Sequence, residues 1–339
     1  MNLHYELTTA TLHFRKPART SRGAYTEHKM VLVRLTDPET GREAVGECAP
    51  LPDLSSDRHA YDSLSDVEQL LSKALRSDDY QTVLQPYPAL LFAFESALEQ
   101  LQPTPVTPFA LGQTGIPING LVWMADFDDM LRQVEEKLHL GFRCIKLKIG
   151  AIEWDKEIEL IRRIRSQFTQ EQLELRVDAN GAFSLDEAPD KLCQLAEFHL
   201  HSIEQPIRQG QWQAMARLCA ETPLPIALDE ELIGLNRKEE KTAMLDAIRP
   251  QYIVVKPTLH GGLSGAREWI ALARERHIGS WITSALESNI GLRSIALLAA
   301  EQYGADCTFP QGLGTGLLFT DNIDTGIAIR GNRIWITRP

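Results

Sequence analysis

Short apolar runs alternate with amphipathic segments along the chain from residue 117 onward. There are eight such runs, at 117–123, 144–149, 173–178, 201–205, 226–229, 252–256, 280–286 and 306–312. Runs of this length are typical of buried parallel strands, and the segments between them have helical spacing. The alternation predicts a (β/α)8-type, modified TIM barrel with eight strands and about seven helices. An open doubly wound sheet is the alternative, but no GxGxxG motif occurs at the first strand–helix turn.

The first hundred residues follow a different pattern. Residues 3–14 and 28–37 alternate apolar and polar side chains, which indicates antiparallel strands with one solvated face. The polar residues between them, 15–27, predict a loop that acts as a lid. Helical patterns follow at 62–75 and 88–101. Strands followed by helices predict a small α+β domain.

These patterns divide the chain into three parts. We expect an α+β capping domain at 1–110, a barrel domain at 111–315, and a C-terminal segment at 316–339 that returns to the cap. That last segment alternates around Gly331 and Asn332, which predicts a hairpin turning at this pair.

Composition narrows the partners and the compartment. The chain has 339 residues and a formal net charge of −11, which argues against nucleic acid or an anionic membrane as a partner. Its five cysteines show no clustered spacing, which indicates reduced thiols. No signal-peptide pattern is visible, and no apolar run is long enough to cross a bilayer. We therefore expect a cytoplasmic protein with a small-molecule substrate, and the sequence leaves its oligomeric state open.

Five charged residues stand at the ends of five consecutive predicted strands. They are Lys148, Asp178, Glu204, Asp229 and Lys256, separated by 30, 26, 25 and 27 residues. A strand, a turn and a crossover helix together take about 30 residues, so each step corresponds to one β/α unit. The carboxyl ends of parallel barrel strands meet on one face, where active sites form. The spacing therefore predicts that the five side chains share one site.

Three of these residues are carboxylates, Asp178, Glu204 and Asp229. Three anionic groups brought together would repel one another unless a cation lies between them. Their hard oxygen ligands suit Mg²⁺, with Mn²⁺ as a possible alternative. Separately solvated loop carboxylates are the alternative interpretation.

Lysines flank the carboxylates on both sides. Lys146 and Lys148 are two residues apart and so share one face of their strand, while three strands separate that strand from the one that ends at Lys256. Mutual repulsion and a nearby cation are expected to lower the pKa values of Lys146 and Lys148, so that one of them can act as a general base. The alternative is that the lysines simply pair with the neighbouring acids. A cation and amine bases suit the removal of a proton α to a carboxylate, through an enediolate.

The motifs around these residues resemble the enolase superfamily, muconate-lactonizing-enzyme subgroup. They are KLK at 146–148, DAN at 178–180, EQP at 204–206, DE at 229–230 and KP at 256–257, supported by FRKPARTSRG at 14–23, GECAPLP at 46–52, SALESNIG at 284–291 and QGLGTG at 311–316. The resemblance implies a barrel under an α+β cap and Mg²⁺ bound by Asp178, Glu204 and Asp229.

The resemblance also implies an activity, that of a carbon–oxygen lyase of menaquinone biosynthesis. Lys148 would take the α-proton of 2-succinyl-6-hydroxy-2,4-cyclohexadiene-1-carboxylate, and loss of hydroxide would give 2-succinylbenzoate. Lys146 would hold the substrate carboxylate, and Lys256 would stabilise the intermediate from the opposite face. Racemisation of N-succinylamino acids or epimerisation of dipeptides, with Lys148 and Lys256 as two bases, is the alternative. A non-catalytic barrel that only binds its ligand is a third reading, and it predicts loss of at least one of these residues.

Several further residues are candidate substrate contacts. Ser284, Glu287 and Ser288 follow the seventh predicted strand and could hold a second carboxylate, and Gly312 allows close backbone approach. Arg22, in the predicted lid, could meet an anionic substrate. His260 follows Lys256 in the loop KPTLHGG, and we expect it to bond to the backbone, with a substrate contact as the alternative.

Overall fold

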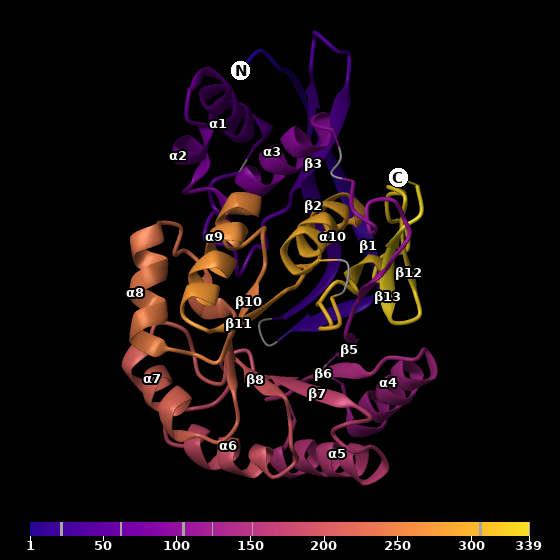
Figure 1. The fold of residues 1–339 in the computed structure, drawn as a ribbon, viewed down its shortest axis with the longest axis vertical. Helices are drawn as coiled ribbons and strands as arrows, with labels where there is room; N and C mark the ends of the chain where they lie inside the picture. Colours follow the sequence, from indigo (N-terminus) through magenta and orange to yellow (C-terminus); the bar gives the residue numbers. More distant parts are fainter. Residues whose placement is uncertain are drawn as a thin grey trace.

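The computed structural model describes residues 1–20, 23–61, 63–103, 106–123, 125–150, 152–304 and 307–338. Two parts are visible in Figure 1: a cap that contains the N-terminus, and a curved parallel sheet with helices along its outer side. A small third sheet lies near the C-terminus. Among the described residues, no helix is long and apolar enough to span a membrane.

The cap consists of an antiparallel sheet covered by helices. Its strands are ordered β1–β2–β3. The elements are β1 (His4–Thr20), β2 (Gly23–Thr36), β3 (Glu43–Cys48), α1 (Leu64–Arg76), α2 (Tyr80–Leu84) and α3 (Pro88–Leu101). Helix α3 packs its apolar side chains against the sheet, with Phe94 fully buried. Burial of this helix between the sheet and the barrel explains why its sequence is apolar nearly all round.

The predicted polar loop at 15–27 is instead the outer part of a β hairpin. Its residues extend β1 and β2, with an irregularity in the register between His13 and Ala18. Strand pairing uses backbone groups, so a polar sequence is compatible with a solvated two-stranded ribbon. The prediction of a loop was therefore wrong for the described residues of this segment.

The barrel sheet contains seven parallel strands in the order β5 to β11. The strands are β5 (Gly120–Val122), β6 (Cys144–Lys148), β7 (Glu174–Asp178), β8 (Ser202–Glu204), β9 (Ile226–Leu228), β10 (Tyr252–Val255) and β11 (Gly279–Ile282). The helices are α4 (Phe127–His139), α5 (Trp154–Gln167), α6 (Ala188–Ala196), α7 (Trp212–Glu221), α8 (Lys238–Ile248), α9 (Gly262–Glu275) and α10 (Asn289–Tyr303). Helices α4 to α8 follow the outer curve of the sheet, and α9 and α10 lie toward the cap (Figure 1).

The eighth strand position is filled by two residues rather than by a full strand. Gln311 bridges to Ile118 beside β5, and Gly312 bridges to Thr283 just beyond β11, both in parallel. The backbone N–H of Gln311 donates to the carbonyl of Pro117 at 2.9 Å, and that of Gly312 to Ile282 at 2.8 Å. These bonds join the two edges of the seven-stranded sheet, so the barrel is closed as predicted, but by a shorter segment.

The C-terminal segment forms the predicted hairpin, β12 (Ile327–Arg330) and β13 (Arg333–Ile336). Strand β13 pairs with the short strand β4 (Ile116–Pro117), which precedes the barrel. Before the hairpin, Phe319 bridges to Phe14 of β1. The segment thus contacts both the cap hairpin and the start of the barrel.

Two buried carboxylates of the cap lie at the N-termini of two barrel helices. Glu47 accepts hydrogen bonds from the backbone N–H groups of Ser288, at 2.9 and 3.1 Å, and of Gly291, at 3.0 Å, where α10 begins. Glu95 accepts from the N–H of Ser264 at 3.0 Å in the first turn of α9. The first N–H groups of a helix have no partner within it and carry partial positive charge, so both contacts dock the cap on the barrel.

Candidate active site

All five charged residues stand where the sequence predicts. Lys148, Asp178 and Glu204 are the last residues of β6, β7 and β8, and Asp229 and Lys256 follow β9 and β10 directly. The sheet register places Lys148 beside Asp178, and Asp178 beside Glu204. The carboxyl end of the barrel therefore brings the five side chains together.

Each lysine pairs with a carboxylate of this group. Lys146 Nζ donates to both oxygens of Glu204, at 2.7 and 2.6 Å, and lies 2.8 Å from Asp178 Oδ2. Lys148 Nζ donates to Asp178 Oδ2 at 2.6 Å, and Lys256 Nζ donates to Asp229 Oδ2. Each of the three lysine nitrogens thus contacts at least one of the three carboxyl groups.

Burial and these pairings set the protonation of the group. Burial favours a neutral amine, but the charges of Asp178, Glu204 and Asp229 outweigh it and raise the pKa of Lys146. Burial also favours the neutral form of Lys256, but the charges of its neighbours, Asp229 foremost, outweigh burial and raise the pKa of Lys256. In this arrangement, attraction by the acids exceeds repulsion between the amines, as in the alternative of lysines paired with neighbouring acids. The lowering of the lysine pKa values by a nearby cation stays a prediction.

The carboxylates differ from one another. Burial, followed by the neighbouring charge of Asp178, raises the pKa of Glu204 to about 8. Burial acts the same way on Asp178, but Lys146 and Lys148 outweigh it and lower the pKa of that carboxyl. The pKa of Asp229 is likewise lowered, because Lys256 outweighs burial.

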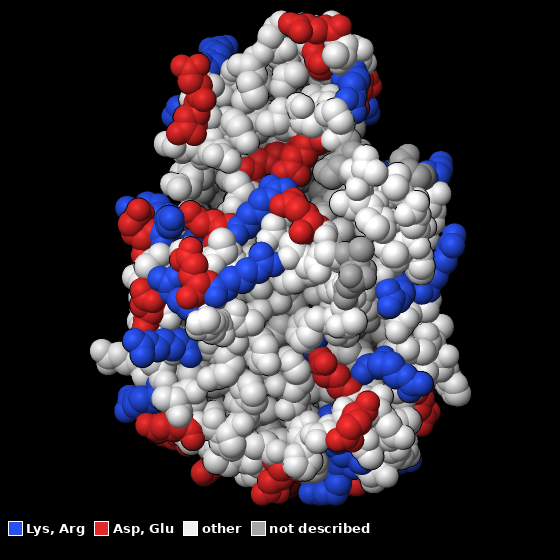
Figure 2. Space-filling view, in the orientation of Figure 1, with Lys and Arg blue, Asp and Glu red and all other residues white. Residues whose placement is uncertain are grey.

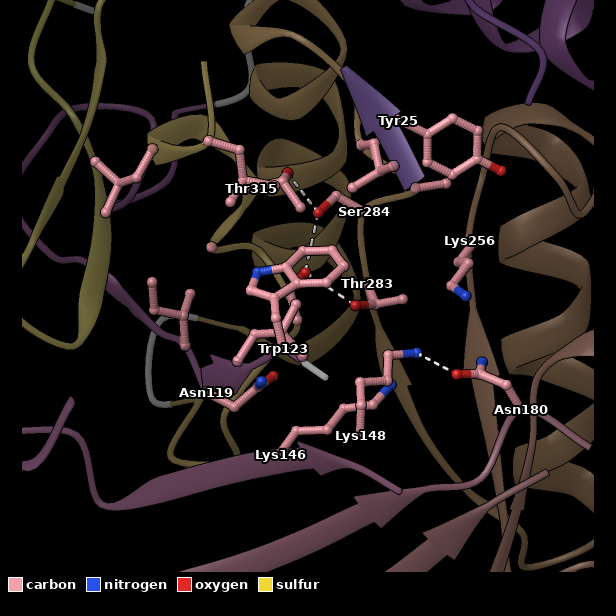
Figure 3. A pocket seen from close by; sticks show the side chains of 18 of the residues that line it. Tyr25, Asn119, Trp123, Lys146, Lys148, Asn180, Lys256, Thr283, Ser284 and Thr315 are labelled. Atoms are coloured by element: carbon pink, nitrogen blue, oxygen red, sulfur yellow. Dashed lines mark hydrogen bonds between the residues drawn. The ribbon is translucent and has the colours of Figure 1, made fainter. Parts of the chain in front are cut away.

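A cavity opens over these residues between barrel and cap. Its wall includes Lys146, Lys148 and Lys256, which enter from the barrel floor and side in Figure 3. Tyr25 of the cap hairpin and Trp123 after β5 face the same space. The remainder of the described lining is largely apolar, including Leu51, Leu54, Ile118, Leu121, Leu286, Leu317 and Leu318. One end of the cavity is cationic and the rest is suited to a hydrocarbon ring.

The predicted substrate contacts divide into two groups. Ser284 and Gly312 line the cavity, and Ser284 Oγ donates to the Gly312 carbonyl at 3.1 Å. Glu287 and Ser288 are not among the described lining residues, since Glu287 bonds to Thr258 and the N–H of Ala285, and Ser288 bonds to Glu47. The prediction for Arg22 lies outside the described residues.

Asn180 and Glu230 also line the cavity. Both belong to motifs found in the sequence, DAN and DE, but no role was predicted for either. Asn180 accepts a hydrogen bond from Lys148 Nζ at 2.8 Å and donates to Glu230 Oε1 at 3.0 Å. Asn180 has φ 45°, a left-handed conformation that asparagine tolerates better than most residues. Their positions, two residues after Asp178 and directly after Asp229, were the available signal.

The donor set fits a hard divalent cation. Asp178, Glu204 and Asp229 are at most 2% exposed, and Asp229 Oδ1 has no hydrogen-bond partner among the described residues. In the arrangement described, the lysine ammonium groups lie against these carboxylates, and no three acidic, histidine or cysteine side chains of the described residues already converge as a metal site. Buried carboxylates whose partners include lysine side chains can exchange those lysines for a metal ion.

A closed parallel barrel with amines and buried acids at the carboxyl ends of its strands is the architecture of a barrel enzyme. The family model described as "Enolase C-terminal domain-like" matches residues 129–322. The chain belongs to this family, which confirms the predicted superfamily and the predicted barrel with its α+β cap.

Individual relatives cover the whole chain. The chain is 46% identical to an o-succinylbenzoate synthase of Desulfotalea psychrophila strain LSv54, over 99% of each chain. The crystal structure of MenC from Desulfotalea psychrophila LSv54 is similar with a TM-score of 0.82 and 42% identity, covering 98% of this chain and 99% of that one. A dipeptide epimerase from Cytophaga hutchinsonii, complexed with Mg and the dipeptide D-Ala-L-Val, has a TM-score of 0.82 at 22% identity, over 98% and 92% of the two chains. This last likeness shows the fold alone.

Proposed function

We propose that the protein is a carbon–oxygen hydro-lyase with o-succinylbenzoate synthase activity, acting in menaquinone biosynthesis. It would convert 2-succinyl-6-hydroxy-2,4-cyclohexadiene-1-carboxylate to 2-succinylbenzoate and water. The 46% identity over 99% of both chains to a relative of that name supports the activity. The single observation that carries the chemistry is the placement of Lys148 and Lys256 on two walls of one cavity, from strands separated by three others.

The three lysines have different roles in the proposed reaction. Lys148 accepts the α-proton, and the C–H electron pair moves into the substrate carboxylate to form an enediolate. Those electrons then return to form the new ring double bond as the C–O bond breaks, and the departing hydroxide takes a proton to leave as water. Lys146, whose pKa is raised, stays charged and binds the substrate carboxylate. Lys256 stabilises the intermediate from the other side of the ring.

A lysine acts as a base through a neutral Nζ, and the neighbours of Lys148 Nζ set its orientation. In the arrangement described, its Nζ is held by Asp178 and Asn180. Asn180 accepts from Nζ and would keep the amine oriented after Asp178 turns to another partner. The apolar lining excludes water from the ring, which favours charge stabilisation by the fixed lysines.

Asp178, Glu204 and Asp229 would hold Mg²⁺, with Mn²⁺ as a substitute. The bound ion would supply neutralising charge for the enediolate. The Mg complex of the Cytophaga hutchinsonii epimerase shows the ion in a protein of the same fold. The five cysteines are all free, which supports a cytoplasmic setting for the reaction.

Product analysis tests the proposed activity. The purified protein with Mg²⁺ should convert the cyclohexadiene carboxylate to 2-succinylbenzoate, measured by chromatography. Lys148→Ala should lower kcat by about 10²–10⁴-fold, because it removes the base. Lys156→Ala, an exposed lysine on α5, is the control and should turn over like the unmodified protein. Full turnover by Lys148→Ala would contradict the assignment.

Removal of metal tests the cation site. Exhaustive chelation should abolish dehydration, and added Mg²⁺ or Mn²⁺ should restore it. Asp178→Asn should weaken Mn²⁺ binding, measured by electron paramagnetic resonance of the free ion, because one anionic ligand is lost. Undiminished turnover after chelation would rule out the proposed role of the metal.

A further inference from the structure

His260 is a fully buried histidine beside the site that the proposed reaction does not use. It lies in the loop between β10 and α9, has no exposed surface, and faces Asp229. Its bond to the backbone agrees with the prediction from the sequence: the N–H of Lys256 donates to Nδ1 at 2.9 Å.

That bond fixes the tautomer of the ring. Nδ1 accepts a hydrogen bond and so carries no proton, which leaves the proton on Nε2. A ring that accepts at Nδ1 and carries its single proton on Nε2 is neutral. His260 therefore presents one donor, the Nε2–H group.

The donor is aimed at an acceptor that lacks a partner. His260 Nε2 lies 3.9 Å from Asp229 Oδ1, slightly beyond hydrogen-bond range. Both atoms are buried, and neither has a hydrogen-bond partner among the described residues. The other oxygen of Asp229, Oδ2, is occupied by Lys256. Unpaired buried polar atoms are rare in folded proteins, and two facing each other indicate an interaction completed in another state of the site.

We propose that His260 is the positioning residue of Asp229, directing Nε2–H at Oδ1 while the backbone of Lys256 holds Nδ1. The proposal rests on the proposed function, because it takes Asp229 as a metal ligand. When Asp229 exchanges Lys256 for a cation, the bond from His260 keeps the carboxylate from rotating. Ligating carboxylates depend on such outer hydrogen bonds, whose removal typically weakens metal binding by about 10–100-fold. The His260 ring would thus fix the positions of the Asp229 carboxylate and of the Lys256 backbone together.

Two substitutions separate the two contacts of the ring. Asparagine places an acceptor where Nδ1 lies, so His260→Asn keeps the bond from Lys256 and loses the donor toward Asp229. Glutamine places an N–H donor where Nε2 lies, so His260→Gln keeps the donor and loses the acceptor. The measurement is the Mn²⁺ affinity of each full-length variant after chelation, by electron paramagnetic resonance without substrate.

We expect His260→Asn to bind Mn²⁺ about 10–100-fold more weakly than the unmodified protein, and His260→Gln within about threefold of it. Thermal unfolding without metal serves as the second readout. A merely structural role would lower the thermal stability of both variants and leave the Mn²⁺ affinity of the folded protein equal in the two. That result, or equal binding by His260→Asn and the unmodified protein, overturns the proposal.

The same experiment keeps this inference apart from the proposed activity. Unmodified protein that binds Mn²⁺ but yields no succinylbenzoate would end the proposed activity, while the affinity ratio of the two variants would still decide the role of His260. Unmodified protein that binds no Mn²⁺ would overturn both the metal assignment and this inference.

Discussion

Lys256 decides between the two reactions that a site of this kind could perform. Its Nζ is paired with Asp229, and its raised pKa keeps it protonated in the arrangement described. A protonated amine can stabilise an enediolate, as dehydration requires. It can also donate a proton to the second face, as racemisation requires. The pairing with Asp229 therefore fits both reactions, and substitution of Lys256 has to distinguish them.

We expect Lys256→Met to lower kcat for dehydration by about 10²–10³-fold, the usual effect of losing one charge-stabilising group. Lys148→Met should lower it further, because the base itself is lost. Incubation with N-succinylamino acids in deuterium oxide provides the comparison. A racemase would lose racemisation completely in both variants, and efficient racemisation by the unmodified protein without dehydration would reverse our assignment.

The sequence predicts the positions of the reactive residues better than their partners. Strand spacing is a local property, so it placed Lys148, Asp178 and Lys256 correctly. The pKa of Lys146 depends on distances to side chains on two other strands, which spacing does not contain. The role of Asn180 is equally non-local, because it links Lys148 to Glu230.

At the scale of elements, the junction between β3 and α10 contains two buried glutamates with opposite protonation. Burial raises the pKa of Glu287 from 4.5 to about 7. Glu47 is as buried, but hydrogen bonds from His28 and Ser288 outweigh burial and lower its pKa. The first side chain favours its neutral form and the second its charged form.

Glu287 should make the protein less stable as the pH rises. Between pH 4.5 and about 7 the folded protein keeps the proton that the unfolded chain releases, so the free energy of unfolding falls across this window. The shift corresponds to about 3 kcal/mol. Glu287→Gln does not titrate, so its stability relative to the unmodified protein should rise by up to this amount between pH 4.5 and 8. Urea unfolding at the two pH values measures the difference.

Glu47→Gln is the control, because its effect on stability should change with pH in the opposite direction. The lowered pKa of Glu47 means that its charge stabilises the fold above about pH 4.5 and that this contribution is lost as the pH falls through the lowered value. The variant should therefore lose most stability at neutral pH and least in acid. If both variants respond to pH in the same direction, the assigned protonation states are incorrect.

A helix or strand was predicted well where its own sequence pattern determines its structure. The helices α4 and α5 lie in the segments between the first three predicted strands, and β6 coincides closely with the apolar run at 144–149. The hairpin at 15–27 was missed because its residues alternate weakly, and pairing between the backbones of its two strands stabilises it. Propensity and periodicity carry no information on such pairing.

At the scale of the whole molecule, barrel closure depends on the close approach of Gly312 to Thr283. A Cβ atom on Gly312 would lie 1.7 Å from Thr283 Oγ1 and 3.2 Å from its Cα, too close without a backbone shift. Gly312→Ala should therefore lower the free energy of unfolding by about 1–3 kcal/mol and reduce turnover, since this residue also lines the cavity.

Gly314→Ala is the matched control for this substitution. A Cβ atom there would meet only the carbonyl of Asn119, at 3.8 Å, which is ordinary contact. Thermal unfolding of the two variants should therefore diverge. Equal stability of the two variants would mean that the backbone around Gly312 can shift at little cost in free energy.

The alternation of strands and helices was sufficient to predict the barrel, but not how its last position is filled. The pattern at 306–312 indicated a full strand, whereas the described residues there make only two bridges. The residues with which they pair depend on the separation of β5 and β11, which is a property of the entire curved sheet. Over the face shown in Figure 2, acidic and basic side chains are interspersed rather than gathered in one basic area.

The cap glutamates at the starts of α9 and α10 bear on how this protein can change over generations. Residues 47 and 95 supply acceptors that the barrel helices lack on their own. A barrel encoded without its first hundred residues would leave those N–H groups without acceptors on the surface that the cap now covers. Exchange of either part with an unrelated gene segment would break both contacts at once. Selection therefore acts on the cap and the barrel as one heritable unit, and new substrates are reached by changing residues within it.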